Sequence, residues 1–205
     1  ARRVSPMRAT FASFAYRDFV YLWLGQVTHA FALWLEQAAR PLLILALTGS
    51  AVQLGGVIVV RTVPGFVLGP LAGVVADNFN RRTVLMATKT IVLGLSALFA
   101  LLMVTERVEV WHIYAFSFLR GATMAFDQPA RRAMIPSVVP GHLVTNAMAL
   151  STGTMGAMRI AGGAAAGILM GYMGLAAPFV AIVFVYLAAV LFTWMLRTPD
   201  HTRSG

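Results

Sequence analysis

The sequence predicts an all-α integral membrane protein with six transmembrane helices, and three observations lead to this fold class. Of the 205 residues, 59% are hydrophobic and 11% are charged, and the mean hydropathy is +0.78. Soluble globular domains do not have this balance. The chain also contains six apolar runs, each long enough for a helix to cross ~30 Å of hydrocarbon. The basic residues, finally, gather in alternate separators between these runs.

The apolar runs set the expected boundaries of the elements. They lie near residues 19–47, 51–76, 83–104, 110–128, 142–170 and 176–196. Ahead of this bundle, which spans 19–197, residues 1–18 mix arginine with aromatic side chains, a composition typical of the headgroup layer. We therefore expect residues 1–18 to be a cytoplasmic interfacial segment, residues 129–141 to be a loop and residues 198–205 to be a cytoplasmic tail.

Arginine placement predicts the orientation of the chain in the membrane. One side of the expected bundle carries Arg2, Arg3, Arg8, Arg17, Arg81, Arg82, Arg131, Arg132, Arg197 and Arg203. The other side carries Arg107 in a loop. Because cytoplasmic loops are enriched in Lys and Arg, we expect both termini to be cytoplasmic. The net charge of +9 then reflects a lipid bilayer and not nucleic acid, since long apolar runs separate the arginines along the chain.

Residues 69–82 are expected to form the turn that joins the second and third helices. Small residues, Gly69 and Gly73 among them, give the second helix a face against which another helix can pack closely. An acidic residue ends that helix and two adjacent arginines begin the next. This arrangement predicts a short cytoplasmic hinge.

The hinge resembles the motif G-x-x-x-D-x-x-G-R-R/K between helices 2 and 3 of the major facilitator superfamily. The matching residues, to which the resemblance assigns a conformational-switch loop, are Gly73, Asp77, Arg81 and Arg82. Asn80 stands where the family has glycine. Because asparagine enters left-handed backbone geometry at little cost, we expect the turn to keep its shape. The resemblance implies that the acid at position 77 closes the cytoplasmic side by contacting the opposite half of the transporter.

Five further segments resemble the drug and siderophore exporter branch of this family, of the enterobactin type. They are Tyr16–Gln26, Leu47–Ser50, Pro129–Arg131, Pro136–Pro140 and Asn146–Leu150. The resemblance runs nearly from end to end, but it covers only the N-terminal six-helix half of an ordinary twelve-helix member. It implies half of a major facilitator fold, built as a 3+3 inverted repeat. Short internal echoes agree with such a repeat, since residues 36–40 resemble 127–131 and Arg61 has a counterpart at Arg159.

The same resemblance implies secondary active transport, as proton-coupled efflux by antiport of a small amphipathic molecule or siderophore across the bacterial inner membrane. A lone half requires a second six-helix bundle, supplied by a missing half, a second copy or another subunit. The alternative is a non-transporting, major-facilitator-like structural or assembly subunit of a larger membrane complex. The sequence leaves both alternatives open.

Charged residues inside the apolar runs are the candidate proton and substrate residues of a cavity. They are Glu36, Arg40, Arg61, Arg120, Asp127 and Arg159. Each unpaired charge costs about 2.5–3.5 kcal/mol on insertion scales, so these groups should pair or face water. Glu36 and Arg40 are four residues apart on one helix face, which fits a local ion pair. It fits equally a proton-exchanging acid whose neighbour is an arginine.

Three further expectations concern single charged residues. Arg120 resembles the intramembrane arginine of proton-coupled exporters, and pairing with an acid such as Glu36 is the structural alternative to a coupling role. Asp127 is expected in a cytoplasmic charge cluster with the arginine pairs 81–82 and 131–132, and either Glu36 or Asp127 is expected to take the proton. Lys89 is expected to extend to the cytoplasmic surface.

Glycines mark the expected helix-packing positions, which are Gly69, Gly156, Gly162, Gly163 and Gly167. Those in the fifth run resemble the exporters' glycine-rich helix 5 motif, G-x-x-x-G-P-x-x-G-G, with Gly163 at the proline position. We expect a second bundle to lie against the second and fifth helices, with Gly73 and Gly162 at close contacts.

Nothing in the sequence indicates an enzyme. It contains no phosphate loop, no metal-ligand spacing and no nucleophile–base pair in a known context. Cysteine is absent, and His29 is expected to be a hydrogen-bonded interior residue. We therefore expect no enzymatic activity, no metal and no cofactor.

Overall fold

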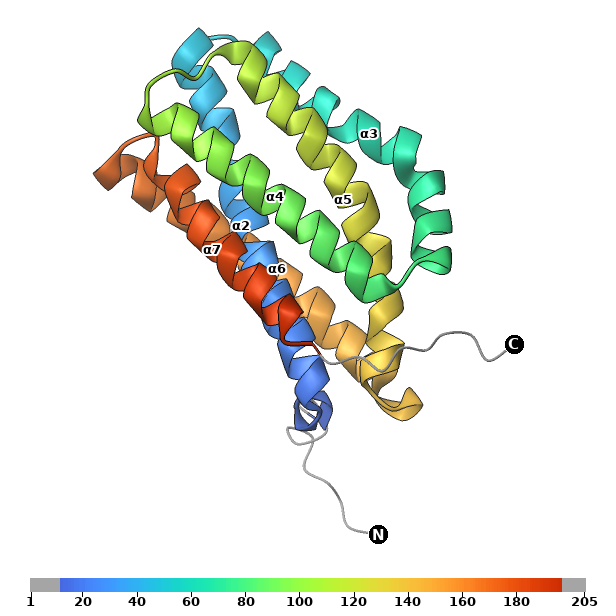
Figure 1. Cartoon of the computed structure of the whole chain (residues 1–205). Coiled ribbons are helices and arrows are strands. Elements are labelled where there is room, and N and C mark those ends of the chain that lie inside the picture. The colour runs from blue at the N-terminus through green and yellow to red at the C-terminus, as the bar shows by residue number, and fades with distance from the viewer. Residues whose placement is uncertain (1–11, 197–205) are drawn as a thin grey trace.

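A computed structural model describes residues 12–196, apart from the side chains of Ala76 and Asp77. All regular structure in that range is helical, as the sequence predicts. The elements are η1 (Ala12–Ala15), α2 (Arg17–Thr48), α3 (Ala51–Asn78), α4 (Arg81–Val104), α5 (Val110–Val138), η2 (Gly141–Leu143), α6 (Val144–Met173) and α7 (Ala177–Trp194). The long helices form one elongated bundle in which the start of α2 and the end of α7 lie at the same end (Figure 1). The expected interfacial segment and tail lie mostly outside the described residues.

Four of the long helices are long and apolar enough to cross a membrane. They cover Arg17–Thr48, Ala51–Val75, Arg81–Val104 and Ala177–Trp194. Helices α5 and α6 are not among these four; α5 carries Arg120, Asp127 and two further arginines, and α6 carries Arg159 and is rich in glycine. Six spans and the 3+3 repeat therefore stay predictions.

The bundle is organised around α2, which packs along most of its length against α6 and α7. Helix α3 packs mainly on α5, and α4 packs on both α5 and α7. The aromatic centre of the core is Phe99 of α4, whose ring lies edge-on to Phe116 and Phe179, each 5.0 Å away between centroids. Helix α3 is the least buried of the long helices, and side chains such as Phe66 are 81% exposed. In a membrane this face meets lipid or another protein.

The turn between α2 and α3 follows directly from its sequence. Gly49 ends α2 with a φ of +63°, and its N–H donates to the Leu45 carbonyl. Such left-handed geometry favours glycine because a Cβ would be strained there. Ser50 then caps α3, since its hydroxyl accepts a hydrogen bond from the N–H of Gln53.

The hinge between α3 and α4 differs from the expected geometry at Asn80. This residue does not enter the left-handed region; its φ is −59° and its ψ is 117°. Asn80 is instead the N-cap of α4, and its side-chain oxygen accepts hydrogen bonds from the N–H groups of Arg82, at 3.0 Å, and Thr83, at 3.4 Å. Capping two free N–H groups is a strong preference of asparagine, which accounts for its presence where the family motif has glycine.

Helix α5 is longer than the sequence predicts. The expected loop at 129–141 is wrong over most of its length, because α5 continues through Pro129 and Pro136 to Val138. A proline within a helix removes one donor and one hydrogen bond. The residues beyond Pro129 compensate by burial, since Met134 and Ile135 lie in a closed cluster with Phe19 of α2 and Leu85 of α4.

Candidate functional site

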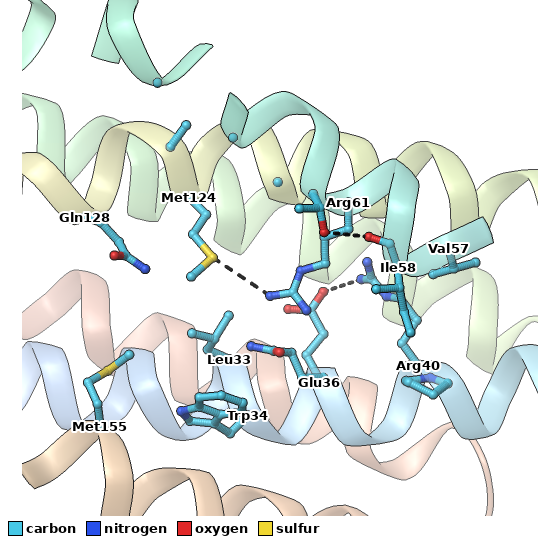
Figure 2. A pocket seen from close by; sticks show the side chains of 17 residues that line it. Leu33, Trp34, Glu36, Arg40, Val57, Ile58, Arg61, Met124, Gln128 and Met155 are labelled. Carbon is cyan, nitrogen blue, oxygen red and sulfur yellow. Dashed lines mark hydrogen bonds and ion pairs between the residues drawn. The ribbon is translucent and has the colours of Figure 1, made fainter. Parts of the chain in front are cut away.

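A cavity of about 770 Å³ opens between α2, α3 and α5, with α6 contributing Met155. Its apolar wall includes Leu33, Val57, Ile58 and Met124, and its polar wall includes Glu36, Gln37, Arg40, Arg61 and Gln128 (Figure 2). This volume lies within the range of sites for small molecules. The mixture of apolar and charged side chains suits an amphipathic occupant.

Glu36 is the centre of a buried charge network on the wall of this cavity. Arg40 pairs with it through Nη2, one helical turn away, which confirms the predicted ion pair. Arg120 of α5 pairs with its other carboxylate oxygen, at 2.9 Å from Nε. Glu36 and Arg40 are each 7% exposed and Arg120 is 3% exposed. Buried charges are stable when they are paired and hydrogen-bonded in this way.

Arg40 and Arg120 are held by further groups that surround the network. Arg40 donates to the Ser117 hydroxyl at 2.9 Å, and its guanidinium lies 5.4 Å from the centre of the Phe99 ring. Arg120 donates to the Tyr186 hydroxyl of α7. The network therefore ties together α2, α4, α5 and α7.

The sequence grouped Arg120 with the cavity residues, but the structure buries it behind Glu36. Arg120 does not line the large cavity, while Glu36, Arg40 and Arg61 do. Its pairing with Glu36, the structural alternative from the sequence, is confirmed.

Arg61 enters the cavity from α3, and no carboxylate among the described side chains pairs with it. Figure 2 shows its side chain extending between Met124 and Glu36, and its recorded side-chain contact is Nη2 to the Met124 sulfur at 3.9 Å. None of the salt bridges among the described residues includes Arg61. Helix α3 can approach α5 closely at this point because Gly121 has no side chain; a Cβ on Gly121 would collide with the Arg61 carbonyl.

Arg159 of α6 lies next to the cavity wall but not in its lining. Its guanidinium stacks over the ring of Trp34 of α2, 5.0 Å from the ring centre. Trp34 does line the cavity. Arg61 and Arg159, which the sequence paired as repeat counterparts, thus lie on α3 and α6 on either side of α2.

Asp127 lies in a second buried cluster and not in the expected cytoplasmic one. It is 2% exposed, and its Oδ2 lies 3.7 Å from Nε2 of His29 and 3.6 Å from Nη2 of Arg131. Thr88 of α4 donates to its other oxygen at 3.4 Å. Of the expected arginine neighbours only Arg131 is an ion-pair partner, because the acid points inward from α5. Asp127 does not line the large cavity. The interior position expected for His29 is confirmed, and its Nε2 faces an acid.

Lys89 of α4 is buried, so the expectation that it extends to the surface is wrong. It is 1% exposed, and its ammonium group donates to the Thr193 hydroxyl of α7 at 2.7 Å and to the Gly25 carbonyl of α2 at 3.4 Å. Long side chains leave the apolar layer only where a path to water is open, and α2 and α7 close that path.

The basic pair of the hinge binds backbone carbonyls of two helices. Arg81 donates to the carbonyl of Ala133, within α5, and Arg82 donates to the carbonyl of Trp194 at the end of α7, each at 2.8 Å. At the end of α7, Arg82 satisfies an acceptor that has no partner within the helix and complements the helix dipole. The pair thereby fastens the start of α4 to two neighbours. The side chain of Asp77, the acid of the motif, lies outside the described residues.

Among the five predicted packing glycines, Gly162 makes a close helix contact. A Cβ on this residue would lie 2.7 Å from the Leu35 nitrogen and 2.8 Å from the Trp34 Cβ, both in α2. The expectation that Gly162 contacts a second bundle is therefore wrong, because its neighbour is a helix of the same chain. A Cβ on Gly69, Gly73, Gly156, Gly163 or Gly167 would meet no atom within 4 Å.

Sequence reasoning missed Tyr186, Thr193 and Ser117 as partners of buried charges, and Trp34 as part of the cavity wall. These side chains occur within apolar runs, where hydroxyl and indole groups look like ordinary packing residues. One feature of the sequence could have indicated them. Arginines and lysines inside the apolar runs outnumber the acids there, so some of these cations must donate to neutral acceptors such as hydroxyl groups. Within the described range, no three His, Asp or Glu side chains converge as metal ligands would.

The apolar helices and the charged cavity between them define an integral membrane protein of the transporter class. Residues 8–204 match the family model of transmembrane secretion effectors, so the chain belongs to this family of the major facilitator superfamily.

Two curated relatives are similar to part of the chain. Macrolide efflux protein A of Streptococcus pyogenes is 26% identical over 127 residues, which are 62% of this chain and 31% of that protein. The staphyloferrin A transporter of Staphylococcus aureus is 26% identical over 159 residues, which are 77% of this chain and 40% of that protein. The matched part thus spans less than half the length of each relative.

Proposed function

We propose that this chain forms one wall of a secondary active transporter that exports a small amphipathic molecule in exchange for protons. The observation that carries this proposal is the cavity of about 770 Å³, whose wall contains Glu36 paired with two guanidinium groups. Membership of the family and the names of the two relatives support export. The expected setting is a bacterial cytoplasmic membrane, with both termini on the cytoplasmic side.

Glu36 is the favoured proton carrier because it links the cavity to a contact between helices. One carboxylate oxygen pairs with Arg40 in the same helix and the other pairs with Arg120 in α5. When a proton binds, the carboxylate loses its charge and with it the attraction to Arg120. Protonation therefore weakens a tie between α2 and α5. Asp127, which pairs with His29 and Arg131, is a second exchange site deeper among the helices.

A second six-helix bundle would complete the transport path. Helix α3 forms part of the cavity wall, and on this helix Gly69 and Gly73 leave room for a close approach of another helix. The relatives are more than twice as long as the parts they share with this chain. A missing half, a second copy or another subunit are the sources that we consider for this bundle.

The test is proton-driven accumulation in inside-out vesicles that contain the chain with the membrane proteins that co-purify with it. The probes are erythromycin, as a macrolide, and staphyloferrin A, and an acid interior drives the exchange. We expect Glu36→Gln and Asp127→Asn to abolish the dependence on the pH gradient, while Glu106→Gln, in an exposed turn, has no effect. If both variants keep full proton-dependent flux, the coupling role is wrong. If the unmodified assembly accumulates neither probe, export is contradicted and the structural-subunit alternative is favoured.

A further inference from the structure

The cavity wall of this chain has an excess of positive charge. Four arginines lie in or beside this wall, Arg40, Arg61, Arg120 and Arg159, against one acid, Glu36. Both oxygens of that acid are already occupied by arginines. The remaining positive charge has no acidic partner among the residues that the structure describes, and each unpaired charge in the hydrocarbon layer is costly.

Arg61 is the cation best placed to meet a ligand. It is half-buried, it projects into the cavity, and its recorded side-chain contact is a weak one to a methionine sulfur. A guanidinium group offers five N–H donors in a planar arrangement that matches a carboxylate. Most of these donors are unused on Arg61.

Arg40 and Trp34 also line the cavity, but their unpaired donors do not face it. Within the described part of the chain, the indole N–H of Trp34 and Nε of Arg40 have no hydrogen-bond partner and are closed in by protein atoms. The donors that a ligand can reach are therefore those of Arg61.

The rest of the wall indicates what else the ligand carries. Leu33, Val57, Ile58, Met124 and Met155 make much of the surface apolar. A purely polar anion would leave this surface in contact with water. An apolar body with an acidic head fits both parts of the wall.

We propose that this cavity selects anionic amphipathic molecules, whose carboxylate binds Arg61, and rejects amphipathic cations. This inference rests on the proposed function, because it names the substrate class of the same cavity. It predicts that the sign of the ligand's charge decides binding when size and apolar area are equal.

The test compares two probes of matched length and opposite charge, 4-phenylbutyrate and 4-phenylbutylamine. Their binding to the assembly in lipid nanodiscs is titrated by saturation-transfer NMR, with empty nanodiscs as the background. We expect the carboxylate to bind at least about tenfold more tightly than the amine, since a charge-assisted hydrogen bond is formed with one and repulsion with the other.

Variants of Arg61 identify the site. Arg61→Gln is expected to weaken binding of the carboxylate by about tenfold, and Arg61→Lys to retain part of it, because the charge remains. Arg107→Gln, in the exposed loop after α4, is the matched control and should bind as the unmodified protein does. Circular dichroism and gel filtration verify that each variant is folded. Tighter binding of the amine, absence of carboxylate binding, or unchanged binding in Arg61→Gln would overturn the proposal.

Failure of this charge selectivity can be distinguished from failure of the proposed export function. Binding of the carboxylate through Arg61 without any proton-driven flux would contradict export and keep the selectivity. Proton-driven flux of an amphipathic cation alone would keep export and contradict the selectivity.

Discussion

Replacing Gly162 by alanine tests the closest helix contact in the bundle. A Cβ at this position would lie 2.7 Å from the Leu35 nitrogen, 2.8 Å from the Trp34 Cβ and 3.0 Å from the Phe31 carbonyl oxygen. Ordinary contacts of a Cβ begin near 3.4 Å. The difference between 3.4 and 2.7 Å, about 0.7 Å, is the distance by which α6 must move from α2. A gap of that size removes about a quarter to a half of the attraction of the atom pairs that it separates.

The energetic balance of this substitution predicts a net loss of stability. Overpacking a closed contact costs about 1–3 kcal/mol, whereas alanine is favoured over glycine inside a helix by about 0.8–1.0 kcal/mol. Two of the three contacts are to backbone atoms, which cannot rotate away, so the upper part of the cost range applies. The thermal midpoint should fall by about 2–4 °C for each kcal/mol, on the scale of soluble domains of this length.

The neighbouring glycine supplies the control. A Cβ on Gly163 would meet no atom within 4 Å, so Gly163→Ala should leave the midpoint unchanged or raise it slightly. Both variants are purified in the same mild detergent, and unfolding is followed by circular dichroism during heating. Equal midpoints for Gly162→Ala and Gly163→Ala would refute the reasoning, because the two changes differ only in what the new methyl group meets.

Three further predictions follow from the buried charges and the expected topology. Glu36→Gln should destabilise the folded protein by about 3–5 kcal/mol, because it leaves two buried arginines without their acid. Glu106→Gln is the control and should not change the stability; equal stability of the two variants in thermal unfolding would contradict the prediction. Lys89, the one lysine of the chain, should resist an amine-acylating reagent in the folded protein and react after denaturation, as mapped by mass spectrometry; complete modification without unfolding would show that it is accessible. Since the chain has no cysteine, Asn80→Cys should react with a membrane-impermeant maleimide only from the cytoplasmic side and Arg107→Cys only from the outside, and the reverse pattern would invert the proposed topology.

Some features of the candidate site could be predicted because they are local. Glu36 and Arg40 occupy one face of one helix, so their pairing depends only on the helical repeat. Gly49 and Ser50 end one helix and begin the next through preferences that act over a few residues. Such features hold whichever helices become neighbours.

Other features could not be predicted because they depend on helix neighbours and depth. Pro129 suggested a loop, but burial of the residues that follow it outweighs the loss of one backbone hydrogen bond. Asp127 looked cytoplasmic from its sequence position, and its direction from α5 places it against His29 instead. Gly162 looked like a contact for a partner, and its neighbour is α2.

The sequence by itself determined the class of protein and the set of charged residues inside the helices, because hydropathy and charge placement are properties of the chain and need no neighbour. The tertiary structure decided which of these charges meet. It pairs Glu36 with Arg120 across two helices, buries Lys89 between α4, α2 and α7, and leaves Arg61 in the cavity with no acidic partner among the described residues. The physical reason is that a buried charge is stabilised by whatever group lies within hydrogen-bonding distance, and helix packing sets that distance.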